Sequence, residues 1–250
     1  MDLVIRGGRV IDPGNTIDNK LDVAVQNGKI AAVGHNLKAS TTDEYNASGC
    51  IVTPGLIDCH VHCYEYATPL GINPDSQCLA RGVTTVVDAG SAGAGTFLGL
   101  KKYVIEANKT RVFALLHIAA HGLAAAGCAG LGSGGECDSL NQVNVDWCTK
   151  CIQQYPDDIV GVKVRLTADV CDNGKLENEA YKRAKAAAQK AGLPLMVHHS
   201  FSCVPTQSNH GDLCSGCPGG LQKGDIYTHA FHGYPQTIIN SETKQSTLMS

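Results

Sequence analysis

The sequence has no long apolar run and little net charge, and each of these absences argues against a class of protein. No run approaches the roughly 18 apolar residues that a membrane-spanning helix needs. The net charge is only −3 and no basic stripe stands out, which argues against a nucleic-acid partner. The apolar content of 43% over 250 residues is typical of a globular protein with one sizeable core or two small ones.

The N-terminal segment MDLVIRGGRVID lacks the apolar stretch and the cleavage site of a signal peptide. We therefore expect a cytoplasmic protein that needs neither a membrane nor a nucleic acid as partner. In that compartment the 12 cysteines are expected to be reduced, mostly buried thiols rather than a disulfide framework.

Two cysteine pairs have the spacing of metal ligands. Cys148 and Cys151 are predicted to lie on a helix, where residues three apart share a face by default. Cys214 and Cys217 lie in a glycine-rich segment near His210, which would suit a structural zinc ion. Neither pair has a matching second pair, so both are weak signals.

The pattern of apolar and polar residues changes near residue 50. Residues 1–50 alternate apolar and polar positions, and Asn27-Gly28 between two such runs predicts a hairpin in a small antiparallel β module. From residue 51, short apolar runs alternate with helical segments, which predicts βα units and a parallel sheet. Strands are expected over 51–62, 83–90, 111–118, 158–166, 193–199 and 225–231, and a clear helix over 176–192.

The length of the chain limits the number of βα units that it can form. A complete eight-fold (β/α) barrel of the TIM type uses about 250 residues, whereas the roughly 200 residues after the β module support about six units. We therefore predict an α/β fold with an incomplete TIM-type barrel over 51–250, preceded by a small β module over 1–50.

Four histidines and a lysine lie at or near the carboxyl ends of predicted strands, where barrels place their active sites. His60 and His62 are two apart on one strand and therefore face the same way. Taken alone, this pair could equally be solvated or hydrogen-bonded histidines. His198, His229 and Lys163 end or lie within three further strands, and convergence of all five side chains on one rim is hard to explain as packing.

Lys163 is the least expected of the five because valines flank it and predict burial. An ammonium beside two divalent cations would be repelled and desolvated, so the neutral amine is favoured. A neutral amine can react with carbon dioxide to give a carbamate, which is an anionic ligand able to bridge two metals. The alternative is a lysine that reaches past the sheet to solvent.

The segments TPGLIDCHVH, GVKVRL, LMVHH and YTHAF resemble the amidohydrolase superfamily. Within it, GVTTVVDAGSAGAG and the Gly-Glu-Cys stretch at 135–137 resemble the deacetylase-like, dihydroorotase-related enzymes more than hydantoinases. The resemblance implies a TIM-type barrel with a composite β-sandwich, to which residues 1–50 contribute the N-terminal part.

The resemblance also implies a ligand set for two divalent metal ions, with zinc expected. His60 and His62 match the ligands of the more buried metal, and His198 and His229 match those of the more exposed metal. Lys163 matches the carboxylated lysine that bridges both ions. The superfamily also uses an aspartate at the end of strand eight. The sequence contains no matching residue, from which we expect the 250-residue chain to hydrolyse poorly by itself.

Other residues near the rim are weaker candidates. Asp58 shares the face of the histidine pair and could support those ligands, while Ser91 and Gly93 lie in a glycine-rich loop suited to substrate contact. Arg165 shares a strand face with Lys163 and could meet a substrate carboxylate. His117, His121, His199, His210 and His232 are not expected to be ligands.

The sequence thus predicts a binuclear metal-dependent hydrolase acting on amide or ester bonds of small molecules, in the manner of a deacetylase. A cyclic-amide hydrolase of the dihydroorotase or hydantoinase type would use the same ligands. A non-catalytic scaffold with the same fold is the alternative from another class, and it need not hold two metals. Unpaired strand edges favour a homo-oligomer.

Overall fold

Two units divide the chain between Leu56 and Ile57. The computed structural model describes residues 2–38, 43–125, 134–204, 219–232 and 234.

The first unit is a five-stranded sheet in the order β3-β2-β1-β4, with β5 also paired to β1. Its strands are β1 (Leu3–Asp12), β2 (Ile17–Gln26), β3 (Lys29–Gly34), β4 (Glu44–Asn46) and β5 (Ile51–Val52). The hairpin predicted at Asn27-Gly28 joins β2 and β3, and both turn residues have positive φ, as a two-residue hairpin loop requires. The prediction of a purely antiparallel module is wrong, because β4 and β5 pair in parallel with β1.

The second unit contains a six-stranded sheet in the order β11-β10-β9-β8-β7-β6. Its strands are β6 (Leu56–Val61), β7 (Val83–Asp88), β8 (Arg111–His117), β9 (Ile159–Leu166), β10 (Leu195–His199) and β11 (Ile226–Thr228). Neighbours from β7 to β11 pair in parallel, so the α/β class is confirmed. Each strand lies beside the strand before it in the chain, and the curled sheet is consistent with an incomplete barrel.

One of the six predicted strands does not form as a single strand. The segment 51–62 forms two strands, β5 in the first sheet and β6 in the second. Pro54 and Gly55 lie between them, and a proline that lacks an N–H interrupts a strand ladder. The other five strands begin and end within a few residues of their predicted bounds.

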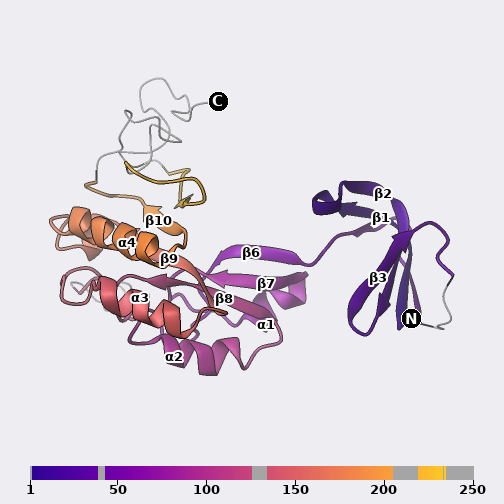
Figure 1. The fold of residues 1–250 in the computed structure, drawn as a ribbon, viewed down its shortest axis with the longest axis horizontal. Helices are drawn as coiled ribbons and strands as arrows, with labels where there is room; N and C mark the ends of the chain where they lie inside the picture. Colours follow the sequence, from indigo (N-terminus) through magenta and orange to yellow (C-terminus); the bar gives the residue numbers. More distant parts are fainter. Residues whose placement is uncertain (1, 39–42, 126–133, 205–218, 233, 235–250) are drawn as a thin grey trace, which may run out of the picture. The chain divides into compact units, whose positions relative to one another are not determined.

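Two helices cover one face of this sheet. α3 (Val145–Gln154) and α4 (Glu177–Ala191) lie side by side and pack on β8, β9 and β10 (Figure 1). α4 ends at Gly192 with φ 66°, the left-handed conformation in which glycine commonly ends a helix. The helix predicted over 176–192 is therefore confirmed, and Cys148 and Cys151 are buried on α3.

The remaining helical segments are short. They are α1 (Pro74–Gln77), α2 (Phe97–Leu100), η1 (Pro13–Asn15), η2 (Leu79–Arg81), η3 (Lys101–Ile105) and η4 (Ala168–Val170). None of the helices in the described residues combines the length and apolar character that crossing a membrane requires.

Apolar packing lies on both faces of the six-stranded sheet. The large core lies between the sheet and the helices and includes Leu116, Val164 and Ala184. A smaller cluster, formed by Ala89, Leu115 and Met196, lies on the interior face. Because strand side chains alternate between faces, these residues identify which positions point into the interior.

Candidate active site

The interior face of the six-stranded sheet changes from apolar to polar along its strands. Side chains two residues apart share this face, and the later one in each strand lies nearer the carboxyl end. The pairs are Leu115 and His117 on β8, Gly161 and Lys163 on β9, and Met196 and His198 on β10. Gly161 leaves space for its neighbour, since a Cβ there would lie 2.6 Å from Leu115 Cδ2. The floor of the interior is therefore apolar, and polar groups gather at the carboxyl ends.

Four histidine rings form a continuous row at this end of the sheet. The ring centroids of His60 and His62, both on or directly after β6, are 5.6 Å apart. His60 and His229 are 5.0 Å apart, and His229 and His198 are 4.1 Å apart. The rings come from the first, fifth and sixth strands of the sheet, so the two sheet edges approach each other here.

Lys163 lies on the same interior face and is 2% exposed. Burial lowers the pKa of its ammonium to about 7. Gly90 allows the lysine to lie here, because a Cβ at Gly90 would be 2.6 Å from Lys163 Cγ. Lys163 therefore shares the interior face with the histidine row, and its charge acts to lower the pKa of all four histidines.

In both His60 and His62, a hydroxyl group lies within hydrogen-bond distance of Nδ1. His60 Nδ1 is 2.8 Å from Thr228 Oγ1, and His62 Nδ1 is 3.2 Å from Ser91 Oγ. Asp88, which is fully buried, accepts a hydrogen bond from the backbone N–H of Ser91 and so fixes that residue in turn. Both rings are thereby oriented through Nδ1, and Nε2 remains the nitrogen available to a ligand.

Burial keeps the imidazoles neutral. It lowers the pKa of His60 to about 4 and that of His62 to about 3, with the charge of Lys163 acting in the same direction. The pKa values of His198 and His229 are lowered by the same causes. Neutral imidazole is the form that binds a metal ion.

The donor set of the histidine row has the chemistry that a metal site needs. Imidazole nitrogens suit zinc and other borderline divalent ions, so the chemistry fits. No three His, Cys, Asp or Glu side chains among the described residues already converge as in a formed metal site. His198 Nε2 lies 2.7 Å from Ser200 Oγ, so a metal at this nitrogen would replace that contact.

Comparison with curated proteins identifies relatives. No family model matches the sequence. A deacetylase of Agrobacterium fabrum is 33% identical over 207 residues, which cover 82% of this chain and 47% of that protein. A deacetylase of Enterococcus faecalis is 32% identical over 244 residues, covering 97% of this chain and 60% of that protein. A dihydroorotase of Geobacter metallireducens is 46% identical over 91 residues, 34% of this chain and 21% of that protein.

Solved structures of enzymes with related names are similar to this chain. A dihydroorotase structure superposes with a TM-score of 0.81 at 28% identity, over 94% of this chain and 59% of the other. An adenine deaminase structure gives 0.79 at 29% identity, over 98% and 61%. The chain belongs to the amidohydrolase superfamily. It spans about half the length of the curated superfamily members that it matches.

Two of the weaker candidates, predicted to lie in a loop suited to substrate contact, are buried. Ser91 is fully buried against His62. Gly93 is buried too, and a Cβ there would lie 1.9 Å from the carbonyl oxygen of Ala119. Asp58 is exposed, and its carboxylate accepts a hydrogen bond from the backbone N–H of His60 at 3.0 Å.

Arg165 is held by a partner that sequence reasoning missed. Its Nε lies 2.8 Å from Glu136 Oε1, and the Glu136 side chain is fully buried. Glu136 belongs to the Gly-Glu-Cys stretch, so the sequence signal was present, but nothing local connected it with β9. The ion pair fixes the guanidinium on the face shared with Lys163.

His117 and Asp88 are two further buried polar residues at the rim that sequence reasoning did not assign. Burial raises the pKa of the Asp88 carboxyl, and it lowers the pKa of His117 well below its ordinary value. His117 directly opposes Lys163 across the β8–β9 pairing. No spacing within the sequence identifies such a pair, because it depends on strand register.

The other histidines lie away from the row. His199 turns to the opposite face, where its Nδ1 is 3.1 Å from the Tyr227 hydroxyl. His232 Nε2 contacts the carbonyl oxygen of His199 at 2.9 Å, and His121 is half-buried. His210 and the Cys214/Cys217 pair lie outside the described residues. The cysteines within them are free, and six of these nine are buried.

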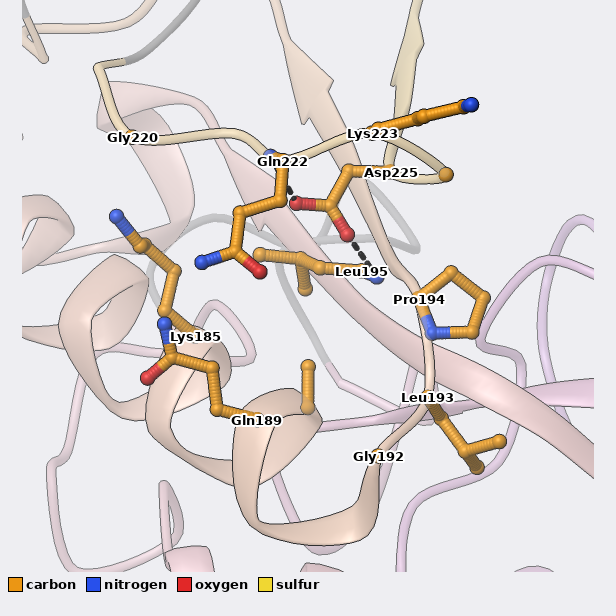
Figure 2. Close-up of a pocket in the computed structure, with 12 residues that line it drawn as sticks. Lys185, Gln189, Gly192, Leu193, Pro194, Leu195, Gly220, Gln222, Lys223 and Asp225 are labelled. Atoms are coloured by element: carbon orange, nitrogen blue, oxygen red, sulfur yellow. Dashed lines mark hydrogen bonds between the residues drawn. The ribbon is translucent and has the colours of Figure 1, made fainter.

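A pocket of about 490 Å³ lies at the amino ends of β10 and β11, whereas the histidine row lies at the carboxyl ends of the strands. Figure 2 shows the residues that line this pocket. Lys185 and Lys223 lie on its wall. The Asp225 carboxylate accepts hydrogen bonds from the backbone N–H groups of Leu195 and Gln222. Asp225 therefore ties the starts of two strands together, and the pocket contains none of the histidines.

Proposed function

We propose that this chain provides the histidine and lysine ligands of a binuclear metal-dependent hydrolase that cleaves amide or ester bonds of small molecules, as a deacetylase does. The observation that carries the proposal is the unbroken row of four histidine rings at the carboxyl ends of the strands, on the interior face that also holds buried Lys163. The 33% identity to a curated deacetylase supports it.

In this proposal two divalent ions, with zinc expected, bind at the rim. His60 and His62 would hold the more buried ion, and His198 and His229 would hold the more exposed one. Lys163, as a carbamate, would be a ligand of both. Its burial favours the neutral amine, which is the form that reacts with carbon dioxide.

Such a metal pair supplies a bound water of lowered pKa and polarises the carbonyl of the substrate. The residues of this chain orient the groups around it. If the Nδ1 contacts of His60 with Thr228 and of His62 with Ser91 carry the ring protons, each Nε2 lone pair is left for a metal. Ser91 thus acts on a ligand rather than on the substrate.

Arg165 is the residue of this rim best suited to recognise a substrate carboxylate. The buried Glu136 carboxylate holds its guanidinium in one orientation, and the planar fork of an arginine matches a carboxylate. An N-acetyl or O-acetyl derivative of an amino or hydroxy acid would present both a carboxylate and a cleavable acetyl group.

A cyclic-amide hydrolase is the second candidate, because a dihydroorotase is 46% identical over 91 residues. Both candidates use the same ligands. Turnover of acetylated amino or hydroxy acids, tested beside dihydroorotate and hydantoin, distinguishes them. A homo-oligomer and a cytoplasmic location, both expected from the sequence, stay predictions.

Metal analysis tests the proposal directly. The chain loaded with zinc and freed of excess ion should hold close to two equivalents by plasma mass spectrometry. Changing His60 and His62 together to alanine should remove at least one equivalent. His35→Ala is the matched control, because His35 is an exposed histidine of the first unit. Unchanged metal content in the double variant, or equal loss in the control, contradicts the proposed ligand set.

A further inference from the structure

The buried ring of His117 has one nitrogen with a partner and one without. His117 ends β8 on the interior face and is 0% exposed. Its Nδ1 accepts a hydrogen bond from the backbone N–H of Ala119 at 3.0 Å. Its Nε2 has no hydrogen-bond partner among the described residues. An orphaned polar atom in a closed interior is uncommon and calls for an explanation.

The bond at Nδ1 determines the tautomer. A neutral imidazole has one donor nitrogen and one acceptor nitrogen. Since Nδ1 is the acceptor, the single proton is on Nε2. His117 therefore presents a buried N–H donor that has no acceptor within the described part of the chain, and leaving such a donor unsatisfied is unfavourable.

Lys163 is the neighbour of this donor. His117 and Lys163 are paired residues of β8 and β9, and the backbone N–H of Ile118 donates to the Lys163 carbonyl at 2.9 Å. Both side chains lie over Gly90. A Cβ at Gly90 would be 2.6 Å from Lys163 Cγ and 3.2 Å from His117 Cδ2, the ring carbon bonded to Nε2.

We propose that His117 donates a hydrogen bond from Nε2–H to an oxygen of the carbamate on Lys163, and so favours carboxylation of this lysine. The inference rests on the proposed function, since it takes the carbamate from there. Carboxylation needs no redox partner: the Nζ lone pair forms a bond to the carbon of carbon dioxide, one C–O π pair moves to oxygen, and a proton leaves Nζ for solvent. The new oxygens supply the acceptor that the donor lacks.

His117 is a positioning residue in this proposal. It stabilises the anion on Lys163 and contacts no substrate. Hydrogen bonds to charged groups are among the stronger ones, and this bond would exist only in the carboxylated state. Its removal should therefore weaken carbon dioxide binding by about tenfold or more.

Four variants test the inference. His117→Phe keeps a planar ring and removes the donor, whereas His117→Gln keeps an N–H donor. Lys163→Ala removes the carboxylation site. His199→Phe is the matched control, because His199 is equally buried but has partners at both nitrogens, the Tyr227 hydroxyl and the Val204 carbonyl. Circular dichroism reports whether each variant folds.

The readout is the carbamate itself. The zinc-loaded chain is equilibrated with ¹³C-bicarbonate at fixed pH, and the carbamate carbon is followed by ¹³C NMR as dissolved carbon dioxide is raised. We expect a signal that Lys163→Ala lacks. His117→Phe should need at least about tenfold more carbon dioxide for half-saturation, while His117→Gln and His199→Phe should stay within about threefold of the unaltered chain.

The outcomes separate this inference from the proposed function. Normal half-saturation in His117→Phe, or an equal loss in His199→Phe, overturns the role of His117 alone. A missing lysine-dependent signal in the unaltered chain overturns both the role of His117 and the proposed carbamate, while the zinc content of the histidine variants still tests the ligand set.

A second measurement on the unaltered chain covers the case that His117→Phe does not fold. With ¹⁵N-labelled histidine, Nε2 of His117 should carry a proton that exchanges slowly and moves downfield when carbon dioxide is added. A proton on Nδ1 instead, or a resonance that carbon dioxide leaves unchanged, overturns the inference.

Discussion

Replacing Gly90 with alanine should destabilise the protein and displace Lys163, because the new Cβ would collide with the lysine side chain. This steric effect can be separated from backbone strain. Gly90 has φ 91°, which an L side chain rarely adopts, and the new Cβ would lie 2.6 Å from Lys163 Cγ and 2.9 Å from Lys163 Cβ. Real Cβ atoms are not found at such distances, so Lys163 or its strand must move. The substitution therefore tests whether the close approach of Gly90 fixes the position of the lysine.

Gly82 provides the matched control. Its φ of 88° is nearly the same, but a Cβ there would meet nothing within 4 Å. Gly82→Ala should cost the backbone strain alone, about 1–2 kcal/mol. Gly90→Ala should cost this amount and the overpacking of the interior, a further ~1–3 kcal/mol.

Urea unfolding of the three proteins gives the free energies of unfolding, and plasma mass spectrometry gives their zinc content. We expect Gly90→Ala to be less stable than Gly82→Ala and to retain less zinc. Equal stability of the two variants, with equal zinc content, would refute the argument that Gly90 is needed for the placement of Lys163.

Three further predictions concern single side chains. Lys163→Ala should lose bound zinc, and high concentrations of a short carboxylic acid should restore part of it; a high-resolution map with two metals bound beside an unmodified Lys163 ammonium would contradict the bridging role. Thr228→Val, which removes the hydroxyl 2.8 Å from His60 Nδ1, should weaken zinc binding by about 10-fold or more in a chelator competition, and Thr228→Ser should restore it. Asp75→Asn should lower the free energy of unfolding at neutral pH by about 1 kcal/mol, because the Asp75 carboxylate accepts hydrogen bonds from two backbone N–H groups and a hydroxyl. These donors lower the folded-state pKa of Asp75 below its ordinary 3.8, so its stabilisation is present above that pH and is lost as pH falls through the lowered value. A difference between the two proteins that persists unchanged at pH 2 in chemical unfolding would be inconsistent with this reasoning.

Local patterns predicted most of the second sheet. The apolar runs over 111–118 and 158–166 have the length and composition of buried parallel strands, and the structure has β8 and β9 there. The helix over 176–192 was marked by its glycine end. The segment 51–62 was misjudged because its apolar character continues across Pro54 and Gly55, although the ladder cannot.

The sequence predicted the histidine row from strand alternation, but it could not predict the groups that surround the row. Ser91 meets His62 because a loop after β7 lies beside the end of β6, and Glu136 meets Arg165 across 29 residues. Pairing of β4 and β5 with β1 is equally non-local. Such contacts depend on register and loop path, and neither has a local signature.

The hydrogen bond between His60 and Thr228 joins residues that are 168 apart in the sequence. Closing so long a loop costs entropy that only the completed packing of the intervening strands can offset. As the chain leaves the ribosome, the histidines of β6 emerge long before their neighbours on β10 and β11 exist. The rim is therefore assembled late in folding, and an ion captured earlier would be held by one pair of imidazoles alone.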